Sequence, residues 1–376
     1  CKVSIMNKNT SKTTAPHAKR SIVKRFGSWF KKLSILKKSL FILLITAVLF
    51  VAQAYAIALW YQKKHANEPL TFGVTFIPNY ARFFDLDPQE TMLALRDDLG
   101  FKRFRLVSYW KDIEKTPGQY DFSELDWQFE KVNEVGGEVS LAIGLRQPRW
   151  PECHAPEWVK AENKEEWYPQ LKNFMAAVIE RYGDNPALVS YQLENEYFLG
   201  VFGECSHYGI ERERLVDEYN HVKSLDSNTP VILSYANNYF GVATGEPQPD
   251  QVGVSVYKRV WEQTVTKRYF EYPFPSWYYS WRAGLQEILK GQDSMLHELQ
   301  AEPWTPSDVK SVSIEEQSKS MDAARLKERI SYGAATGFRD IDLWGGEWWY
   351  WRKEAKNDPS LWEAVREQLQ QEFAEN

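Results

Sequence analysis

From about residue 70 onward, short apolar runs alternate with amphipathic helical stretches, and this alternation constrains the fold more than any other feature of the sequence. Strands that alternate with helices are typical of βαβ units, in which the strands pair in parallel and the helices cover the sheet. Runs with the length and apolar content of strands lie at 71–76, 103–107, 138–143, 188–193, 230–234, 252–256, 295–300 and 340–343. The main helical patterns between and after them lie at 88–99, 123–135, 164–182, 211–225, 277–290, 314–335 and about 359–373.

This succession of strands and helices predicts a (β/α)₈ barrel over residues 70–376. The alternative is a doubly wound open sheet, which usually carries a Gly-rich phosphate loop directly after its first strand. Residues 77–80 follow the first strand here and read Ile-Pro-Asn-Tyr, without a Gly-x-Gly pattern. The sequence therefore favours the barrel.

The first 66 residues differ in charge from the rest of the chain. They hold 13 Lys and Arg residues and no Asp or Glu, whereas residues 67–376 carry the other 33 basic residues and all 51 acidic ones. A basic tail on an acidic body indicates two environments. The acidic body argues against nucleic acid as the main partner, because phosphate binding favours a basic face.

Residues 40–61 form a run of 22 residues without a charge, which is long enough for a helix to cross a bilayer core of about 30 Å. Eleven Lys and Arg residues precede the run and only Lys63 and Lys64 follow it closely. The positive-inside rule therefore places the N-terminus in the cytoplasm and the body outside. The predicted domains are a basic cytoplasmic tail (1–39), a transmembrane signal-anchor (40–61), a linker (62–69) and the barrel (70–376).

A cleaved signal peptide is the alternative for this segment. Residues 40–51 have the length of an apolar signal region, and Ala52-Gln53-Ala54 or Ala54-Tyr55-Ala56 fits the small-residue cleavage pattern. The basic region in front would be unusually long, and the apolar run continues past both sites, so the uncleaved anchor is favoured. In either case the body is exported, as a membrane-anchored or as a secreted protein.

The chain has three cysteines. Cys153 and Cys205 lie in loops after predicted strands, and in an exported domain such a pair is expected to form a disulfide, with two free buried thiols as the alternative. Cys1 stands where Met is expected, which indicates an incomplete or unusual gene start. A lipidated N-terminal cysteine is the alternative for Cys1.

Glutamates stand at the ends of the fourth and seventh predicted strands. Alternate residues of a strand face the same way, so Glu194 and Glu196 share one face, and Glu298, Gln300 and Glu302 share another. A polar face on a central barrel strand points into the barrel, where hydrogen bonds can satisfy it. The strand ends then place Glu196 and Glu302 at the C-terminal mouth, where barrel active sites lie. Two such carboxylates are what cleavage of a glycosidic bond requires.

In their order and approximate spacing, Asn195-Glu196 and Glu302 resemble the catalytic positions of the large clan of retaining glycoside hydrolases built on (β/α)₈ barrels, which includes cellulase-, β-mannanase- and β-galactosidase-like families. In that clan the acid/base Glu follows an Asn at the end of strand four, and the nucleophile Glu ends strand seven. The segment from Trp110 to Asp126 is similar to one that recurs in several of these families. The resemblance covers about residues 70–350 and implies a retaining β-glycosidase.

The resemblance also implies a role for each matching residue. Glu302 would be the nucleophile, held ionised by Arg105 and by the hydroxyl of Tyr257. Glu196 would be the general acid and then the general base. Asn195 would hold the 2-OH of the sugar, a contact that tightens in the transition state.

Tryptophan numbers 16 in this chain, and many of these residues fall in predicted loops at the mouth of the barrel. Flat rings of this kind bury a large area and stack on the apolar faces of sugars. By the resemblance, Trp344 at the end of strand eight would floor the −1 subsite. Trp110 and Trp304 are predicted as further substrate contacts, and for the cluster at 348–351 sugar contact is favoured over packing.

The histidines and cysteines show no metal-ligand spacing, so neither a metal site nor a cofactor is expected. We therefore interpret the chain as a membrane-anchored, exported, retaining β-glycoside hydrolase whose partner is an oligo- or polysaccharide of the cell envelope or the extracellular space. One alternative is a catalytically inactive barrel that binds glycans. Another is a transglycosylase that uses the same residues.

Overall fold

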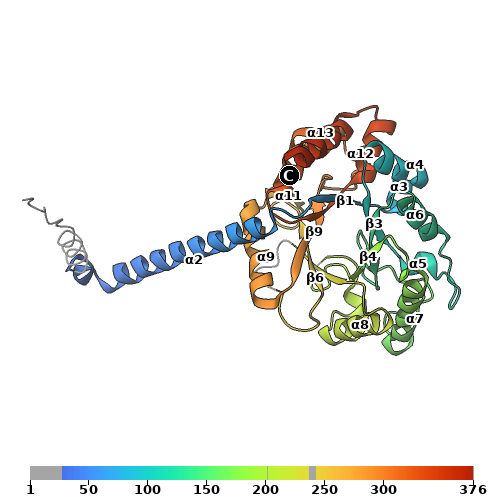
Figure 1. The fold of residues 1–376 in the computed structure, drawn as a ribbon, viewed down its shortest axis with the longest axis horizontal. Helices are drawn as coiled ribbons and strands as arrows, with labels where there is room; N and C mark the ends of the chain where they lie inside the picture. The colour runs from blue at the N-terminus through green and yellow to red at the C-terminus, as the bar shows by residue number, and fades with distance from the viewer. Residues whose placement is uncertain (1–27, 201, 237–242, 376) are drawn as a thin grey trace, which may run out of the picture. The chain divides into compact units, whose positions relative to one another are not determined.

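The computed structural model describes residues 28–200, 202–236 and 243–375, and the predicted barrel is present within them. Eight parallel strands close into a ring in the order β1-β10-β9-β6-β5-β4-β3-β2 (Figure 1). The strands of the ring are β1 (Thr71–Thr75), β2 (Arg103–Val107), β3 (Glu138–Ile143), β4 (Leu188–Leu193), β5 (Val231–Tyr235), β6 (Gln251–Val256), β9 (Asp293–Gln300) and β10 (Asp340–Trp344). A doubly wound open sheet is thereby excluded, since such a sheet does not close.

Three of the eight strands, β2, β3 and β4, have the bounds that the sequence predicts, and the others differ by one or two residues at their ends. The agreement follows from the apolar runs, because each run supplies the residues that pack between the ring and its helices. The α-helices that follow β1 are α3 (Pro78–Phe83), α4 (Pro88–Leu93), α5 (Trp110–Ile113), α6 (Ser123–Asn133), α7 (Lys164–Tyr182), α8 (Arg212–Leu225), α9 (Ser276–Lys290), α10 (Ile314–Ser320), α11 (Ala323–Ala334), α12 (Gly346–Ala355) and α13 (Ser360–Glu375).

The long helix predicted over 314–335 is divided into α10 and α11. Met321 between them is extended, and the side chain of Asp322 accepts a hydrogen bond from the backbone N–H of Arg325 as the N-cap of α11. A capping Asp of this kind satisfies an N–H that would otherwise have no partner, so it favours a new helix start. The apolar periodicity continues across the break, which is why the sequence suggests one helix.

A two-stranded antiparallel hairpin lies between β6 and α9 and was not predicted. Its strands are β7 (Arg259–Glu262) and β8 (Arg268–Glu271), and they lie outside the ring. The carboxylate of Glu262 accepts hydrogen bonds from the backbone N–H groups of Thr264, Val265 and Thr266 and so closes the turn. The hairpin extends the chain at the end of β6, on the side of the barrel where the strands end.

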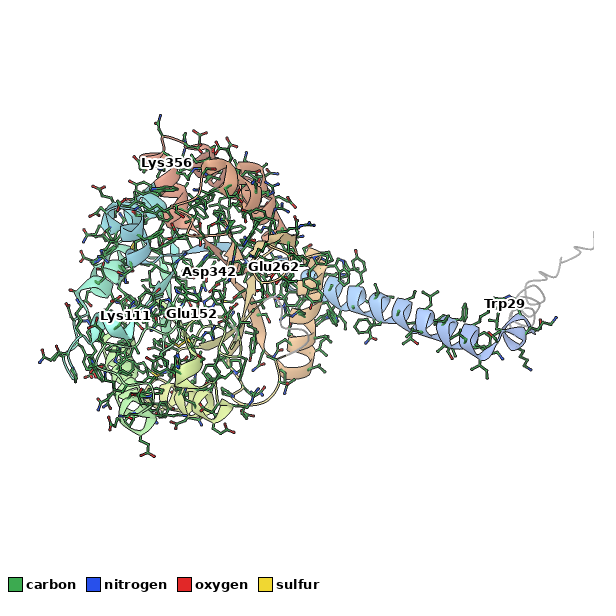
Figure 2. All side chains as sticks on the ribbon, turned by 180° about the vertical axis from the view of Figure 1, so that it is seen from behind. Trp29, Lys111, Glu152, Glu262, Asp342 and Lys356 are labelled. Atoms are coloured by element: carbon green, nitrogen blue, oxygen red, sulfur yellow. A yellow bond between two sulfur atoms is a disulfide. The ribbon has the colours of Figure 1, made fainter. Side chains whose placement is uncertain are left out.

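Polar side chains fill the inside of the barrel, as the strand alternation predicts. Nε of Arg103 on β2 lies 3.0 Å from Oδ1 of Asp342 on β10, the two strands that flank β1, and Asp342 lies within the body of the barrel (Figure 2). Two residues further along β2, Arg105 donates to Gln192 and to Glu298. Arg103 and Arg105 are thus each paired with a buried carboxyl group, which is the condition under which a barrel interior tolerates charge.

Contacts divide the chain into two units, residues 1–54 and 55–376. Helix α2 (Ile35–His65) is long and apolar enough to cross a membrane, with a mean hydropathy of 2.5 in its most apolar window, a property that signal sequences share. Cys1 and most of the predicted cytoplasmic tail lie outside the described residues. The signal-anchor and its orientation therefore stay predictions.

The last turns of α2, from Tyr55 to His65, belong to the barrel unit. Ala58 and Tyr61 are buried, and Nε2 of Gln62 donates to the hydroxyl of Ser280 at 2.8 Å. The helix thus runs four residues into the segment predicted as a linker, and its end is packed against α9.

Candidate active site

The turn after β4 carries the Asn-Glu pair that the sequence singles out. Glu194 and Glu196 have positive φ angles of 51° and 42°. A left-handed backbone is uncommon for residues other than glycine and is concentrated at functional sites. The backbone N–H of Glu196 donates to the hydroxyl of Ser234, at 2.9 Å, from the neighbouring strand β5. This bond holds Asn195 and Glu196 at the mouth of the barrel.

Arg105 and Tyr257 converge on Glu298. Nη1 of Arg105 lies 2.7 Å from Oε1 of Glu298, and the hydroxyl of Tyr257 donates to Oε2 at 2.7 Å. The prediction that these two residues hold Glu302 is therefore wrong. Strand parity places Glu298 and Glu302 on one face but leaves their depth open, and four residues of strand span about 13 Å.

Glu302 lies just beyond the end of β9 and has different partners. Its Oε1 accepts hydrogen bonds from Nη1 of Arg149, at 3.0 Å, and from Nε1 of Trp344, at 2.8 Å. The guanidinium carbon of Arg149 lies 3.3 Å from the ring centroid of Tyr80 and 4.3 Å from that of Trp344. Glu302 and Trp344 therefore meet at the mouth, as the strand ends predict, with Arg149 over the indole ring.

Asn195 connects Arg105 to another acidic residue. Its Oδ1 accepts from Nη2 of Arg105 at 3.0 Å and from Nε2 of Gln192 at 2.8 Å, and its Nδ2 donates to Oε2 of Glu152 at 2.9 Å. Donors on one side and an acceptor on the other fix which way the amide points. The amide N–H that is left can serve a sugar hydroxyl.

The pKa of Glu196 is strongly perturbed. Burial raises the pKa of Glu196 to about 8, and the nearby carboxylates of Glu298 and Glu152 act in the same direction. The hydroxyl of Ser255 and the charge of Arg146 act against the shift. A carboxyl group with such a pKa keeps its proton at neutral pH and can donate it to a leaving group.

Sequence reasoning missed two charged residues at this site, Arg149 and Glu152. Both lie in the loop between β3 and α7, and both have positive φ angles, of 79° and 72°. The sequence offers a weak signal for them, namely two opposite charges that flank Trp150-Pro151 in a loop after a strand. Nothing in the sequence alone indicates that the loop folds inward.

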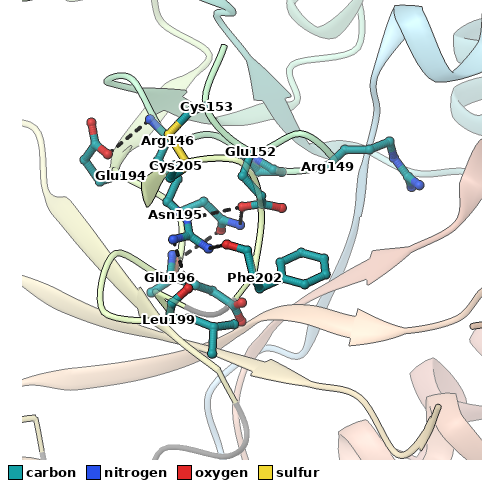
Figure 3. A network of polar contacts seen from close by, with 12 residues as sticks. Arg146, Arg149, Glu152, Cys153, Glu194, Asn195, Glu196, Leu199, Phe202 and Cys205 are labelled. Carbon is teal, nitrogen blue, oxygen red and sulfur yellow. Dashed lines mark hydrogen bonds and ion pairs between the residues drawn. A yellow bond between two sulfur atoms is a disulfide. The ribbon is translucent and has the colours of Figure 1, made fainter. Parts of the chain in front are cut away.

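The predicted disulfide between Cys153 and Cys205 is present in the structure. It ties this loop to the segment that follows β4, as Figure 3 shows. The two segments that carry Glu152 and Glu196 are thereby linked covalently.

The predicted aromatic contacts divide into two groups. Trp304 is half-buried, and its ring centroid lies 5.3 Å from that of Tyr257, so it stands beside the site. Trp110 is completely buried, and its ring packs against Trp158 and Phe174. The predicted sugar contact of Trp110 is therefore wrong, because neither face of its ring is accessible.

The tryptophans at 348–351 are also buried. They belong to α12, and Nε1 of Trp348 donates to Gln317 at 2.9 Å, while Nε1 of Trp349 donates to the carbonyl of Ala301 at 2.8 Å. Packing therefore accounts for this cluster, and the expectation of sugar contact is wrong. The bond to Ala301 instead supports the backbone directly before Glu302.

No group of three or more His, Cys, Asp or Glu residues is arranged to hold a metal ion in the part of the chain that the structure describes. The arrangement at the mouth can perform acid–base and nucleophilic chemistry with carboxyl groups alone. One carboxyl group, that of Glu196, favours the protonated form, and another, that of Glu298, is bound by a guanidinium and a phenol.

Residues 90–229 match the family model described as β-galactosidase. Over 136 residues the chain is 28% identical to the β-galactosidase GanA of Bacillus subtilis, an alignment that covers 31% of this chain and 20% of GanA. Over 139 residues it is 31% identical to the β-galactosidase GalA of Bacillus licheniformis, again covering 31% of this chain and 20% of the relative. The chain thus matches about a fifth of the length of these curated relatives.

Among solved structures, the fold is similar to that of GH5_18 from Streptomyces cattleya in complex with GlcNAc, with a TM-score of 0.55. The two proteins are 11% identical, and the match covers 82% of this chain and 81% of the other. At this identity the likeness concerns the fold. Together with the matches to β-galactosidases, it confirms that this chain resembles the retaining glycoside hydrolases built on (β/α)₈ barrels.

Proposed function

We propose that this protein is a retaining β-glycosidase in which Glu298 is the nucleophile and Glu196 is the acid/base. The observation that carries the proposal is the convergence of Arg105 and Tyr257 on the two oxygens of Glu298, each at 2.7 Å. A guanidinium and a phenol O–H each donate to one oxygen of this carboxyl group and so orient it for attack. Glu302 is paired with Arg149 and bonded to Trp344, and its role would be to bind substrate.

Catalysis would proceed by double displacement. The carboxylate of Glu298 attacks the anomeric carbon while Glu196 gives its proton to the glycosidic oxygen, and the aglycone leaves. Glu196, now ionised, takes a proton from water, and the hydroxide oxygen attacks the same carbon and releases Glu298. Two inversions at the anomeric carbon retain its β configuration.

A β-galactoside is the first candidate substrate, because the matched family and the curated relatives carry that activity in their names. The acceptor would be water, and transfer to a second sugar is the competing outcome. The apolar helix α2 supports attachment to a membrane, with the barrel on the extracytoplasmic side and a glycan of the envelope or the extracellular space as its natural target.

Azide can identify the nucleophile independently of overall activity. Glu298→Gly leaves space for azide on the face opposite the leaving group, and a single displacement would give an α-glycosyl azide from an activated aryl β-galactoside. Glu196→Gly keeps the covalent intermediate, which azide would then intercept with a second inversion to give a β-glycosyl azide. We expect these two products in these two variants.

Glu302→Gly is the matched control, since it removes another buried mouth carboxylate from the same strand end. We expect it to weaken turnover without forming an α-glycosyl azide. An α-azide from Glu302→Gly and none from Glu298→Gly would reverse the assignment of the nucleophile. No turnover of any aryl β-glycoside by the wild-type protein, with sugar binding retained, would instead support a glycan-binding barrel.

A further inference from the structure

Glu152 is a buried carboxyl group of the mouth that double displacement does not require. Its residue is 3% exposed, and it lies in the loop between β3 and α7 with a left-handed φ of 72°. Burial raises the pKa of Glu152 to about 7, with Arg146 and the bond from Asn195 acting against the shift. A residue that is both desolvated and held in an uncommon backbone conformation is kept there by its surroundings.

The contacts of Glu152 lead directly to the proposed catalytic residues. Its Oε2 accepts the hydrogen bond from Nδ2 of Asn195 at 2.9 Å, and the same oxygen lies 3.5 Å from Nε of Arg146 (Figure 3). Asn195 in turn accepts from Arg105, which binds Glu298. Glu152 therefore stands at one end of a continuous chain of polar contacts whose other end is the proposed nucleophile.

Several covalent and steric constraints fix the position of Glu152. The next residue, Cys153, is bridged to Cys205, and the backbone N–H of Gln147 donates to the carbonyl of Glu152 at 2.8 Å. A Cβ placed on Gly203 would come within 2.8 Å of the side chain of Glu152. The loop after β4 thus approaches Glu152 so closely that only a glycine fits at that point.

Arg146, which is buried, also links the loop between β3 and α7 to the segment after β4. Its Nη1 donates to the carbonyl of Leu199 and its Nη2 to that of Phe202, both at 3.1 Å, while its own backbone N–H donates to the carboxylate of Glu194 at 3.1 Å. Its guanidinium is therefore occupied by two carbonyls and lies beside Glu152 at a longer distance. This leaves the bond to Asn195 as the closest polar contact of the Glu152 carboxylate.

We propose that Glu152 is a positioning residue of the active site, which fixes the amide of Asn195 for the sugar and supplies a negative charge that keeps the proton on Glu196. The inference rests on the proposed function, because it assigns a role relative to Glu196 as the acid. The effect on the sugar is transmitted by Asn195, since the bond to Glu152 helps to set the direction of its amide. The effect on the proton of Glu196 is electrostatic and acts through space.

The sign of the electrostatic effect follows from the charges around Glu196. Glu298 and Glu152 both disfavour its ionisation, whereas Arg146 favours it. Glu152 itself faces Arg146 and Arg105 as cations and Glu298 as an anion. Once Glu152 is ionised, at neutral pH and above, its charge opposes the loss of the proton from Glu196, so the acid form of Glu196 persists to higher pH.

Glu152→Gln tests this effect because the amide oxygen can still accept from Asn195 while the charge is lost. The measurement is the pH profile of kcat/KM on an alkyl β-galactoside, whose poor leaving group makes the step dependent on the proton of Glu196. We expect the alkaline limb of the Gln variant to move to lower pH by about one unit. Glu157→Gln, which removes an exposed carboxylate further along the same loop, is the matched control and should leave the limb unchanged.

Glu152→Ala tests the positioning effect, because it also removes the acceptor of the Asn195 amide. We expect kcat/KM of the Ala variant to be about tenfold lower than that of the Gln variant. In Glu152→Asp, which keeps the charge, we expect the alkaline limb to lie close to that of the wild type. A Gln variant with an unchanged alkaline limb, or an Ala variant equal to the Gln variant, would overturn the inference.

Loss of folding is distinguished from both effects by titrating the fraction of active protein, since misfolded protein lowers the rate without moving a pH limb. Reducing the disulfide in the wild-type protein gives a second perturbation of the same loop. We expect it to shift the limb in the direction of the Gln variant, and an unchanged limb would contradict the role of the loop. If the wild-type limb does not depend on Glu196, the proposed function itself has failed.

Discussion

At the scale of single residues, the guanidinium of Arg105 organises the candidate site. It donates to Gln192 through Nε and Nη2, to Asn195 through Nη2 and to Glu298 through Nη1, and it is fully buried. A planar fork with fixed donors can hold three acceptors at once, which a single ammonium group cannot do in the same geometry. The amide oxygen of Asn195 and the carboxyl group of Glu298 are therefore both held in part by this one side chain.

Arg105→Lys is expected to keep the positive charge but to lose part of this geometry. We predict that kcat/KM falls by at least about a hundredfold, because the lysine cannot hold all three acceptors. The free energy of unfolding should fall by only about 2 kcal/mol, because the positive charge of the lysine still compensates the buried Glu298. Steady-state kinetics and thermal unfolding measure the two effects. Arg82→Lys, in an exposed ion pair with Glu124, is the control and should change neither. Equal loss in both variants would show that the fork of Arg105 has no special role.

At the scale of elements, the strands were predictable and the loops were not. The bounds of β2, β3 and β4 agree with the sequence because short apolar runs between helical patterns are local signals. The sequence predicts one helix in place of α10 and α11 because their apolar periodicity is continuous, although Asp322 caps the second one. The hairpin of β7 and β8 and the inward fold of the loop at 146–154 depend on contacts with distant residues.

The packing of the end of α2 against α9 is expected to stabilise the barrel. Tyr61 is 3% exposed, whereas Leu59, two residues before it, is 48% exposed. In a protein that comprises residues 55–376, Tyr61→Ala should lower the free energy of unfolding by about 3 kcal/mol, because a large buried ring leaves a cavity. Leu59→Ala should change it by less than about 0.5 kcal/mol.

Urea or thermal unfolding of the two variants side by side measures this difference. Equal stability of the two would mean that the end of α2 does not contribute to the barrel. The segment predicted as a linker would then behave as one, in spite of the bond between Gln62 and Ser280.

At the scale of the whole molecule, an apolar helix joins a basic N-terminal segment to an acidic barrel. We expect the full chain to remain in the membrane fraction after an alkaline wash, which releases proteins held only by electrostatic contacts. Asp substitutions at Leu49 and Val51 should weaken this retention, because each charge near the centre of a span costs about 3 kcal/mol. Release of a soluble protein whose N-terminus follows Ala54 or Ala56 would instead establish the cleaved signal peptide.

By itself, the sequence determined the fold class, the approximate bounds of all eight strands, the Asn-Glu pair after β4 and the two cysteines that form the disulfide. These properties follow from local patterns of apolar residues and from residue types at strand ends. Only the tertiary structure decided which glutamate of the seventh strand of the barrel faces Arg105, because closing the ring sets the depth of β9 relative to β2, and parity along one strand cannot. For the same reason the contact between Glu152 and Asn195 emerges only from the folded chain, since it joins two loops that are brought together by the closed barrel and by a covalent bridge.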